Sequence, residues 1–365
     1  MFRNGRMGTR RNGLGAVGLL AAAGCGAALM TAAGGDADST LSVRTVVTAD
    51  DNPHGGPQAG IRTIRSSVFV KVSDRHEDSP LGPNYQSLLE GPAFGPDGDL
   101  YLTDAAAPAG EPKVLKVDLG TKEVTPLHTD ESSLYSSSQF SPKDGKLYLT
   151  DFNGRVESME PDGSEVTTVF EGEVDGRTVV ADDIAFDAEG NMYITDFTGT
   201  PWEPTGRLIR LEADGSSPSV LQGGLARPNG IAFTPDFSRL WVAEATANRL
   251  SSFGLSEEGT SVIPNDAFIG MTVDRGVREG VEGVVPIALD STAVDADGNV
   301  YQTVHGAGEI LIWNAAGRLV AVVNFADPDV ANLAIEPGTR NAYATVGGET
   351  GGYVYRFKAL AAGIG

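Results

Sequence analysis

Short runs of alternating apolar and polar residues, separated by tight turns, fill the chain from about residue 61 onward. One copy reads GPAFGPDGDLYLTD at residues 91–104, where the turn PDG separates two apolar runs. A second pair of runs follows around a glycine turn, in KVLKVDLGTKEVTPL. Alternation with a period of two around such turns indicates β-hairpins. Each copy therefore predicts four antiparallel strands.

The four-stranded unit returns six times, at intervals of roughly 48 residues. A repeat of this kind predicts an all-β fold, a six-bladed β-propeller. A parallel β-helix is the alternative, but it would have a shorter period and no recurrent aromatic hairpin. The sixth copy is cut short, so we expect the early run at residues 61–72 to complete it and close the ring. An aromatic residue recurs eleven or twelve positions after the first residue of each copy: Tyr101, Tyr148, Tyr193, Trp241, Tyr301 and Tyr343.

If the copies are structurally equivalent, their first residues lie in one circle around the propeller axis. Three carboxylates and one amide would then converge, and such carboxylates repel one another unless a cation neutralises them. The sequence therefore predicts a metal site, although a polar, water-filled tunnel is the alternative. Oxygen ligands without His or Cys suit Ca²⁺ or Mg²⁺ rather than zinc. The six first residues are Glu90, Ser136, Asp182, Asn229, Asp290 and Ala331, of which Glu90, Asp182, Asn229 and Asp290 are the predicted metal ligands.

Residues that end the second strand of each copy should lie on the same face as this circle. They include Asp196, Glu244 and His305, which we expect at the rim or in contact with a substrate. The alternative for His305 is a rim residue held by a hydrogen bond. The segment FTGTPWEPTG at residues 197–206 carries Trp202 between two prolines and is expected to form a stiff rim over the channel mouth. The sequence contains no GxSxG motif, so serine-triad chemistry has little support.

The formal net charge is −22, which argues against nucleic acid and anionic membranes as partners. The only cysteine, Cys25, follows a basic start and an apolar run, the layout of an export signal. Arg10 and Arg11 resemble a twin-arginine signal, and AAGC at residues 22–25 resembles a lipoprotein cleavage box. Simple cleavage near residue 33 is the alternative to lipidation of Cys25.

These features divide the chain into an export signal at residues 1–35, a flexible linker at 36–60 and a propeller at 61–365. We expect an extracellular or periplasmic protein, anchored to a membrane if Cys25 is lipidated. The apolar run is short and glycine-rich, so no transmembrane span is expected in the mature protein.

Three motifs carry a resemblance to a known family: EGPAF at residues 90–94, GLARPNGIAFTPD in the middle and LDSTAVDADGNVY later. The chain resembles the senescence marker protein/gluconolactonase family, regucalcin-like six-bladed propellers. ADDIAFDAEGNMYITDFTGT, WVAEATANRL and the pair Asp290-Ser291 are most similar to its drug-responsive, calcium-dependent lactonase branch. The resemblance covers roughly residues 88–325.

The resemblance implies that Glu90, Asn229 and Asp290 bind a divalent cation, with Asp182 beside it. It also implies that Ser291 lies near the metal. The implied ion is Ca²⁺, with Mg²⁺, Mn²⁺ or Zn²⁺ as alternatives. A second, structural calcium is expected near residues 151–154 and 175–179.

The implied reaction is hydrolysis of a lactone or a related ester of small size. The cation would polarise the carbonyl, and Asp290 would act as general base and then as acid. Because a metal-bound carboxylate is a poor base, Asp183 or Glu244 could take that role instead. One alternative is a surface-displayed or secreted binding propeller with a structural calcium and no catalysis. Another is a different reaction on this fold, such as phosphotriester hydrolysis or a metal-free condensation.

Overall fold

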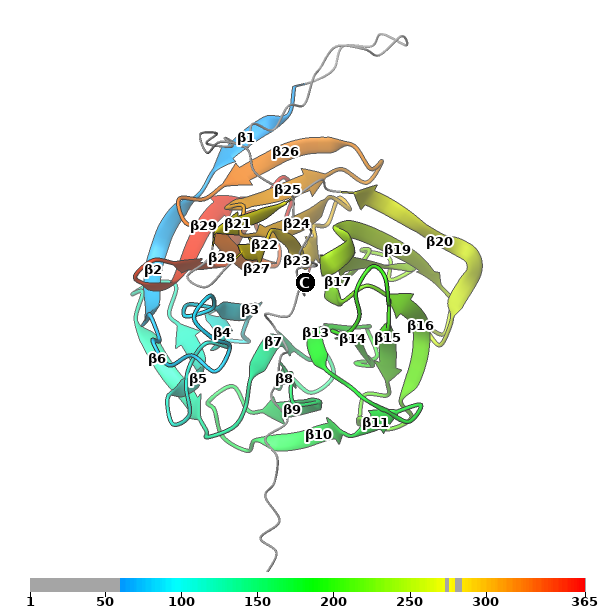
Figure 1. Ribbon diagram of the computed structural model, residues 1–365, viewed down its shortest axis with the longest axis horizontal. Helices are drawn as coiled ribbons and strands as arrows, with labels where there is room; N and C mark the ends of the chain where they lie inside the picture. Colours follow the sequence, from blue (N-terminus) through cyan, green and yellow to red (C-terminus); the bar gives the residue numbers. More distant parts are fainter. Residues whose placement is uncertain (1–59, 273–275, 280–283, 365) are drawn as a thin grey trace, which may run out of the picture.

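Six β-sheets surround a central axis in the computed structural model, which describes residues 60–272, 276–279 and 284–364 (Figure 1). The predicted all-β, six-bladed propeller is confirmed. The expected export signal, Cys25 and the linker up to residue 59 lie outside the described residues. Within the described ranges no helix has the length and apolar character of a membrane span.

The first three blades follow one another in sequence, each running from its innermost strand outward. A short hairpin, β11 (Glu173–Val174) and β12 (Arg177–Thr178), lies between the second and third. The strands of these blades are β3 (Leu89–Phe94), β4 (Leu100–Asp104), β5 (Pro112–Val117), β6 (Val124–Thr129), β7 (Tyr135–Phe140), β8 (Leu147–Asp151), β9 (Arg155–Met159), β10 (Thr167–Glu171), β13 (Ala181–Phe186), β14 (Met192–Asp196), β15 (Gly206–Leu211) and β16 (Ser219–Leu225).

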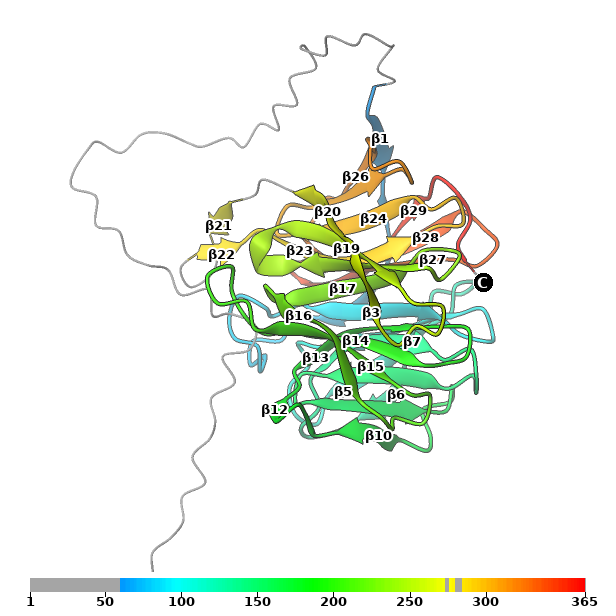
Figure 2. The ribbon, with the colours of Figure 1, turned by 90° about the vertical axis from the view of Figure 1, so that its right-hand side faces the viewer.

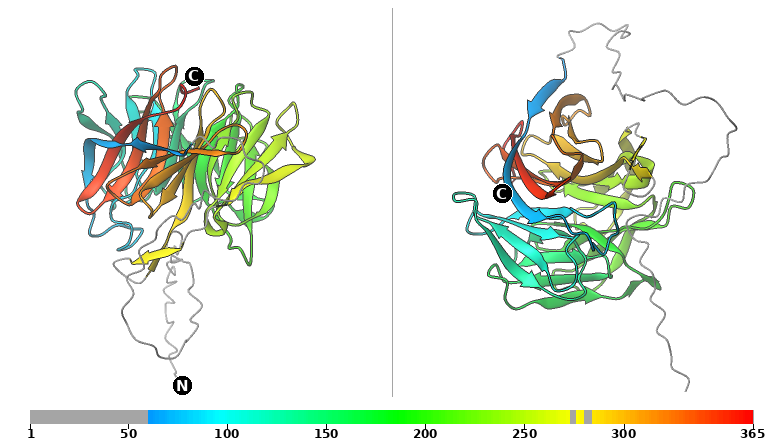
Figure 3. Two further views of the ribbon diagram at one scale, coloured as in Figure 1. Left: turned by 90° about the horizontal axis from the view of Figure 1, so that it is seen from above. Right: turned by 60° about the vertical axis from the view of Figure 1, so that its left-hand side comes forward.

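The fourth and fifth blades are separated by an inserted hairpin, β21 (Val277–Glu279) and β22 (Val284–Pro286). This insertion lengthens the spacing between Asn229 and Asp290 to 61 residues. The hairpin projects from one face of the propeller (Figures 2 and 3). The strands of the two blades are β17 (Pro228–Phe233), β18 (Arg239–Glu244), β19 (Arg249–Leu255), β20 (Val262–Thr272), β23 (Ala288–Val294), β24 (Val300–His305), β25 (Glu309–Trp313) and β26 (Leu319–Asn324), with the 3-10 helix η1 (Ala245–Ala247) after β18.

The sixth blade joins the two ends of the described chain. It consists of β27 (Asp329–Ile335), β28 (Asn341–Gly348), β29 (Gly351–Lys358) and the early strand β2 (Ser67–Asp74), which pairs antiparallel with β29. The predicted closure by the early run is therefore confirmed. The expectation of a single early strand was wrong, because β1 (Arg62–Arg65) pairs parallel with β26 of the fifth blade. The early run thus fastens the last two blades together.

The recurrent aromatic residue of the second strand packs against the neighbouring blade. Its ring meets, edge to face, the phenylalanine that ends the innermost strand next door, and such pairs contribute about 0.5–1.5 kcal/mol each. The ring centres lie 4.9–5.9 Å apart in Tyr101–Phe140, Tyr148–Phe186, Tyr193–Phe233 and Tyr343–Phe94. The aromatic repeat therefore holds successive blades in register.

Candidate functional site

Each innermost strand departs from regular pairing at or beside its first-residue position. The register of the ladder shifts between Glu90 and Ala93 in β3, and between Ala181 and Ile184 in β13. Equivalent shifts occur in β7, β17, β23 and β27. A β-bulge turns side chains away from the alternating pattern of a strand. All six blades therefore use the same irregularity where the chain enters the channel.

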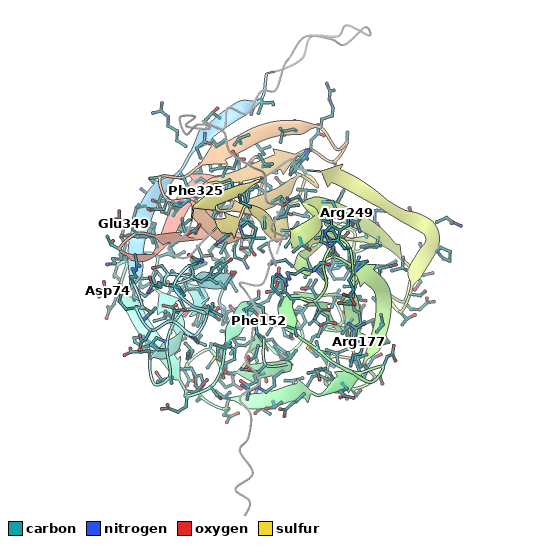
Figure 4. The ribbon with its side chains drawn as sticks, viewed as in Figure 1. Asp74, Phe152, Arg177, Arg249, Phe325 and Glu349 are labelled. Atoms are coloured by element: carbon teal, nitrogen blue, oxygen red, sulfur yellow. The ribbon has the colours of Figure 1, made fainter. Side chains whose placement is uncertain are left out.

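The four predicted metal ligands line one cavity at this end of the channel, with a volume of about 300 Å³. We call Glu90, Asp182, Asn229 and Asp290 the acidic floor. The cavity walls are mostly apolar. Phe152 is one of the wall residues, and Figure 4 shows it nearer the propeller axis than Asp74 and Glu349, which lie at the periphery. The apolar wall residues include Leu88, Phe152, Phe197, Ala245, Ile287 and Leu289.

Burial and mutual repulsion disfavour the ionised carboxylates of the acidic floor. Burial raises the pKa of Glu90 and of Asp182 well above the ordinary range, and the charge of Asp290 raises both further. Burial also raises the pKa of Asp290 to about 6, against the opposing effects of His305 and the Asn229 amide. The Oδ2 atom of Asp182 is buried and has no hydrogen-bond partner among the described residues.

These features fit a divalent cation, because a positive ion would relieve the repulsion and give the Asp182 oxygen a partner. Among the described residues, no group of three or more His, Cys, Asp or Glu side chains is placed to hold a metal ion.

Asp183, directly after the floor residue Asp182, joins four blades. Its carboxylate accepts hydrogen bonds from Ser137 Oγ at 2.6 Å, from the backbone N–H of Ile231 at 3.1 Å and from Ser291 Oγ at 3.3 Å. Burial raises the pKa of Asp183, and these donors oppose that rise. Neither Asp183 nor Ser291 lines the cavity. The Ser291 hydroxyl thus donates to Asp183 in this structure, and its place beside a metal stays a prediction.

Two predicted rim acids are structural. Asp196 is fully buried, accepts from Arg207 Nε at 2.6 Å and caps the backbone N–H of Val180 at 2.9 Å. Glu244 is also fully buried and accepts from Arg249 Nε at 2.5 Å. Neither lines the cavity. The expectation that they face a substrate was wrong, because each carboxylate pairs with an arginine of its own blade and holds the turn before the innermost strand.

The Trp202 side chain is 93% exposed and does not line the cavity. Phe197, which opens the same segment, lines the cavity instead. His305 also lines it: its Nδ1 lies 3.5 Å from Asp290 Oδ2, and its ring stacks on Tyr85 with centres 5.9 Å apart. The sequence thus identified the right segment but the wrong aromatic residue.

A guanidinium lies at one of the two segments near which the second calcium is expected. The segments at 151–154 and 175–179 do meet, since a Cβ on Gly154 would lie 2.7 Å from the Val179 carbonyl oxygen. However, Arg207 donates to the carbonyl oxygens of Val174, Arg177 and Thr178. The Arg207 guanidinium is therefore the hydrogen-bond donor to these three carbonyl oxygens of the β11–β12 hairpin.

Some residues of the site were not predicted, although a repeated threonine and the ARPNG motif were present in the sequence. The threonine in the repeated second strand donates to the carbonyl oxygen of the next blade's first residue. Thr195 Oγ1 reaches Asn229 at 2.8 Å, and Thr303 Oγ1 reaches Ala331 at 2.7 Å. Arg227, in the ARPNG motif, lines the cavity and lies two residues before the floor residue Asn229.

Six blades around a cavity with an acidic floor and mostly apolar walls define a propeller with a candidate small-molecule site on its axis. The chain belongs to the SMP-30/Gluconolactonase/LRE-like region family, whose model matches residues 88–347. This membership confirms the resemblance carried by the motifs.

Curated relatives include proteins named lactonase drp35 from two staphylococci. The one from Staphylococcus epidermidis is 29% identical over 271 residues, covering 71% of this chain and 73% of the relative. The one from Staphylococcus aureus (strain bovine RF122) is 31% identical over 265 residues, covering 71% and 74%.

Solved structures share the fold at low identity. A luciferin-regenerating enzyme matches with a TM-score of 0.63 at 18% identity, covering 82% of this chain and 97% of its own. A calcium-binding protein, regucalcin, from Agrobacterium tumefaciens matches with a TM-score of 0.61 at 16% identity, covering 83% and 98%.

Proposed function

We propose that the protein is a lactonase that depends on a divalent cation, calcium in the first place, held by Glu90, Asp182, Asn229 and Asp290. The observation that carries this proposal is the acidic floor itself: three carboxylates with raised pKa values and one amide line a single cavity. The relatives named lactonase, and the structural neighbour named a calcium-binding protein, support the same function.

The chemistry requires attack of water on the lactone carbonyl carbon and cleavage of the bond to the ring oxygen. A bound divalent cation would polarise that carbonyl and lower the pKa of coordinated water. Asp290 lines the cavity beside His305, where its carboxylate can accept a proton from water and deliver it to the ring oxygen. Glu244 is engaged by Arg249, and Asp183 lies off the cavity wall, so Asp290 is the better base.

The apolar walls limit the substrates that fit. Phe152, Phe197 and Leu289 surround a volume of about 300 Å³ above the acidic floor. A polyhydroxylated lactone would leave its hydroxyl groups without partners on these walls, and burying them would cost free energy. We therefore expect a compact lactone with one polar end and an apolar body, such as dihydrocoumarin.

The first test is hydrolysis of dihydrocoumarin by the mature protein after chelation, with and without added Ca²⁺, Mg²⁺, Mn²⁺ or Zn²⁺. We expect calcium to restore turnover, and Asp290→Asn to lower kcat by about 10²-fold or more because the proton acceptor is removed. Asp297→Asn, an exposed hairpin substitution, is the control.

Full activity in Asp290→Asn, or turnover that chelation does not alter, would contradict this mechanism. No turnover in any condition, with calcium still raising the melting temperature, would favour a binding propeller with a structural calcium.

We also propose that residues 1–35 direct export and that Cys25 receives a lipid, as the basic start and the AAGC sequence suggest. Expression of the full chain in a bacterial host with labelled fatty acid should place label on the wild type and none on Cys25→Ala. Label on neither chain, with the protein free in the medium, would indicate simple cleavage instead.

A further inference from the structure

Arg227 brings a positive charge to a cavity whose floor is acidic. Its guanidinium carbon lies 5.2 Å from the centre of the Phe197 ring, and both side chains line the cavity. Among the described residues that line it, Arg227 is the only lysine or arginine. The charge of Arg227 lowers the pKa of Asp182 against the larger effect of burial. The guanidinium therefore acts electrostatically on the floor itself.

The backbone holds Arg227 in an unfavourable conformation. Its φ angle is 56°, in the left-handed region that side chains other than glycine rarely adopt. Its N–H donates to the Thr198 carbonyl oxygen at 2.8 Å, and its own carbonyl oxygen accepts from the Ala245 N–H at 3.0 Å. Pro228 follows and restricts the chain further. Such a conformation persists only where the surrounding structure holds it, and such conformations are common at functional sites.

Among the described residues no carboxylate forms an ion pair with the Arg227 guanidinium, in contrast to comparable arginines of neighbouring blades. The Nε atom of Arg227 is buried and has no hydrogen-bond partner among the described residues. An arginine keeps its charge at any ordinary pH, and a buried donor without an acceptor costs free energy. Three arginines at the ends of neighbouring blades pair with an acid of their own blade: Arg155 with Asp151, Arg207 with Asp196, and Arg249 with Glu244.

We propose that Arg227 binds the acyl oxygens of the substrate as they become negative, and then the carboxylate of the ring-opened product. This inference rests on the proposed lactonase function. In that reaction a water oxygen bonds to the carbonyl carbon and the ring carbon–oxygen bond breaks. One water proton goes to the ring oxygen, and the new acid releases the other at neutral pH. The product thus carries a charge that the acidic floor repels, and Arg227 offsets it.

The experiment compares wild type with Arg227→Met, which keeps the length of the side chain without its charge, and with Arg227→Lys, which keeps the charge without the planar fork. Arg318→Met, on an exposed hairpin, is the matched control. Two quantities are measured: kcat/KM for dihydrocoumarin, and calorimetric binding of its product, 3-(2-hydroxyphenyl)propanoate, to the chelator-treated and the calcium-loaded protein.

We expect Arg227→Met to lower kcat/KM by about 10²-fold, as for loss of one donor to a developing oxyanion. Product affinity should fall about tenfold or more in Arg227→Met and less in Arg227→Lys. Arg318→Met should match wild type in both quantities. Product affinity and kcat/KM within about twofold of wild type in Arg227→Met would overturn the proposal. Should Arg227→Met fail to fold, Arg227→Gln replaces it in the same measurements.

Failure of the lactonase function would leave a different pattern. Product binding by wild type that Arg227→Met abolishes supports the anion site even when no lactone is turned over. Turnover that Arg227→Met leaves unchanged overturns the anion site alone. The two proposals can therefore fail separately.

Discussion

Two glycines explain why the EGP and PNG motifs need glycine after a floor residue. A Cβ on Gly91 would lie 2.0 Å from the backbone nitrogen of Ser138, and one on Gly230 would lie 2.3 Å from that of Thr292. Both contacts are with the innermost strand of the next blade. The missing side chain lets adjacent strands approach at the axis, where the channel is narrow.

Gly230→Ala tests this close approach. The new methyl group would meet the backbone of β23, which cannot move without opening the ring, so we expect the free energy of unfolding to fall by about 3 kcal/mol. Urea denaturation of the purified protein measures the change. Gly223→Ala is the matched control, because a Cβ at that position meets nothing within 4 Å. Equal midpoints for the two variants would show that the contact is not tight.

At the scale of the element, the period-two pattern predicted the blades well because each hairpin carries its own turn residues and its own aromatic anchor. The division of the early run into β1 and β2 could not be predicted from it. The break at Ser66 depends on the position of the edge strand β26, because β1 pairs with that strand. Ser66 donates through its backbone N–H and its Oγ to the carbonyl oxygen of Asn324, at the end of β26. Such a partner is 258 residues away and leaves no local signal.

The acids that end the second strands show a related limit. The repeat position of Asp196 and Glu244 predicted that they face a substrate. Whether such an acid faces the cavity or is buried in an ion pair depends on the arginine of the next strand. Arg207 and Arg249 each begin a third strand or stand beside its first residue. An acid at the end of the second strand thus pairs with an arginine at the start of the third strand of the same blade. Those two pairs could have been predicted from the sequence. The position of Arg227 in the cavity could not, because it depends on a positive φ angle at a residue other than glycine.

At the scale of the molecule, the floor carboxylates make stability depend on pH. Their folded pKa values are raised by burial and mutual repulsion, to about 6 for Asp290. A carboxyl group with a raised folded pKa stabilises the fold fully below its unfolded pKa, and that contribution is lost as pH rises through the folded value. Without a cation, the floor should therefore destabilise the propeller at pH 8 relative to pH 5.

Calcium should reverse this effect, because it binds the ionised carboxylates and competes with protons at low pH. Asp182→Asn removes one repelling charge and one ligand together. We expect the chelator-treated variant to melt higher than chelator-treated wild type at pH 8, and to gain less from calcium. A purely structural role for Asp182 predicts lower stability in both conditions.

Whether the acidic floor holds a divalent cation can be decided from the melting temperatures of wild type and Asp182→Asn, with chelator or with calcium, at pH 5 and pH 8. At calcium concentrations about 100-fold above the dissociation constant, wild type should gain about 5 °C at pH 8 and clearly less at pH 5, with most of the gain lost in the variant. A calcium effect that is absent at both pH values, or equal in the two proteins, would contradict the account.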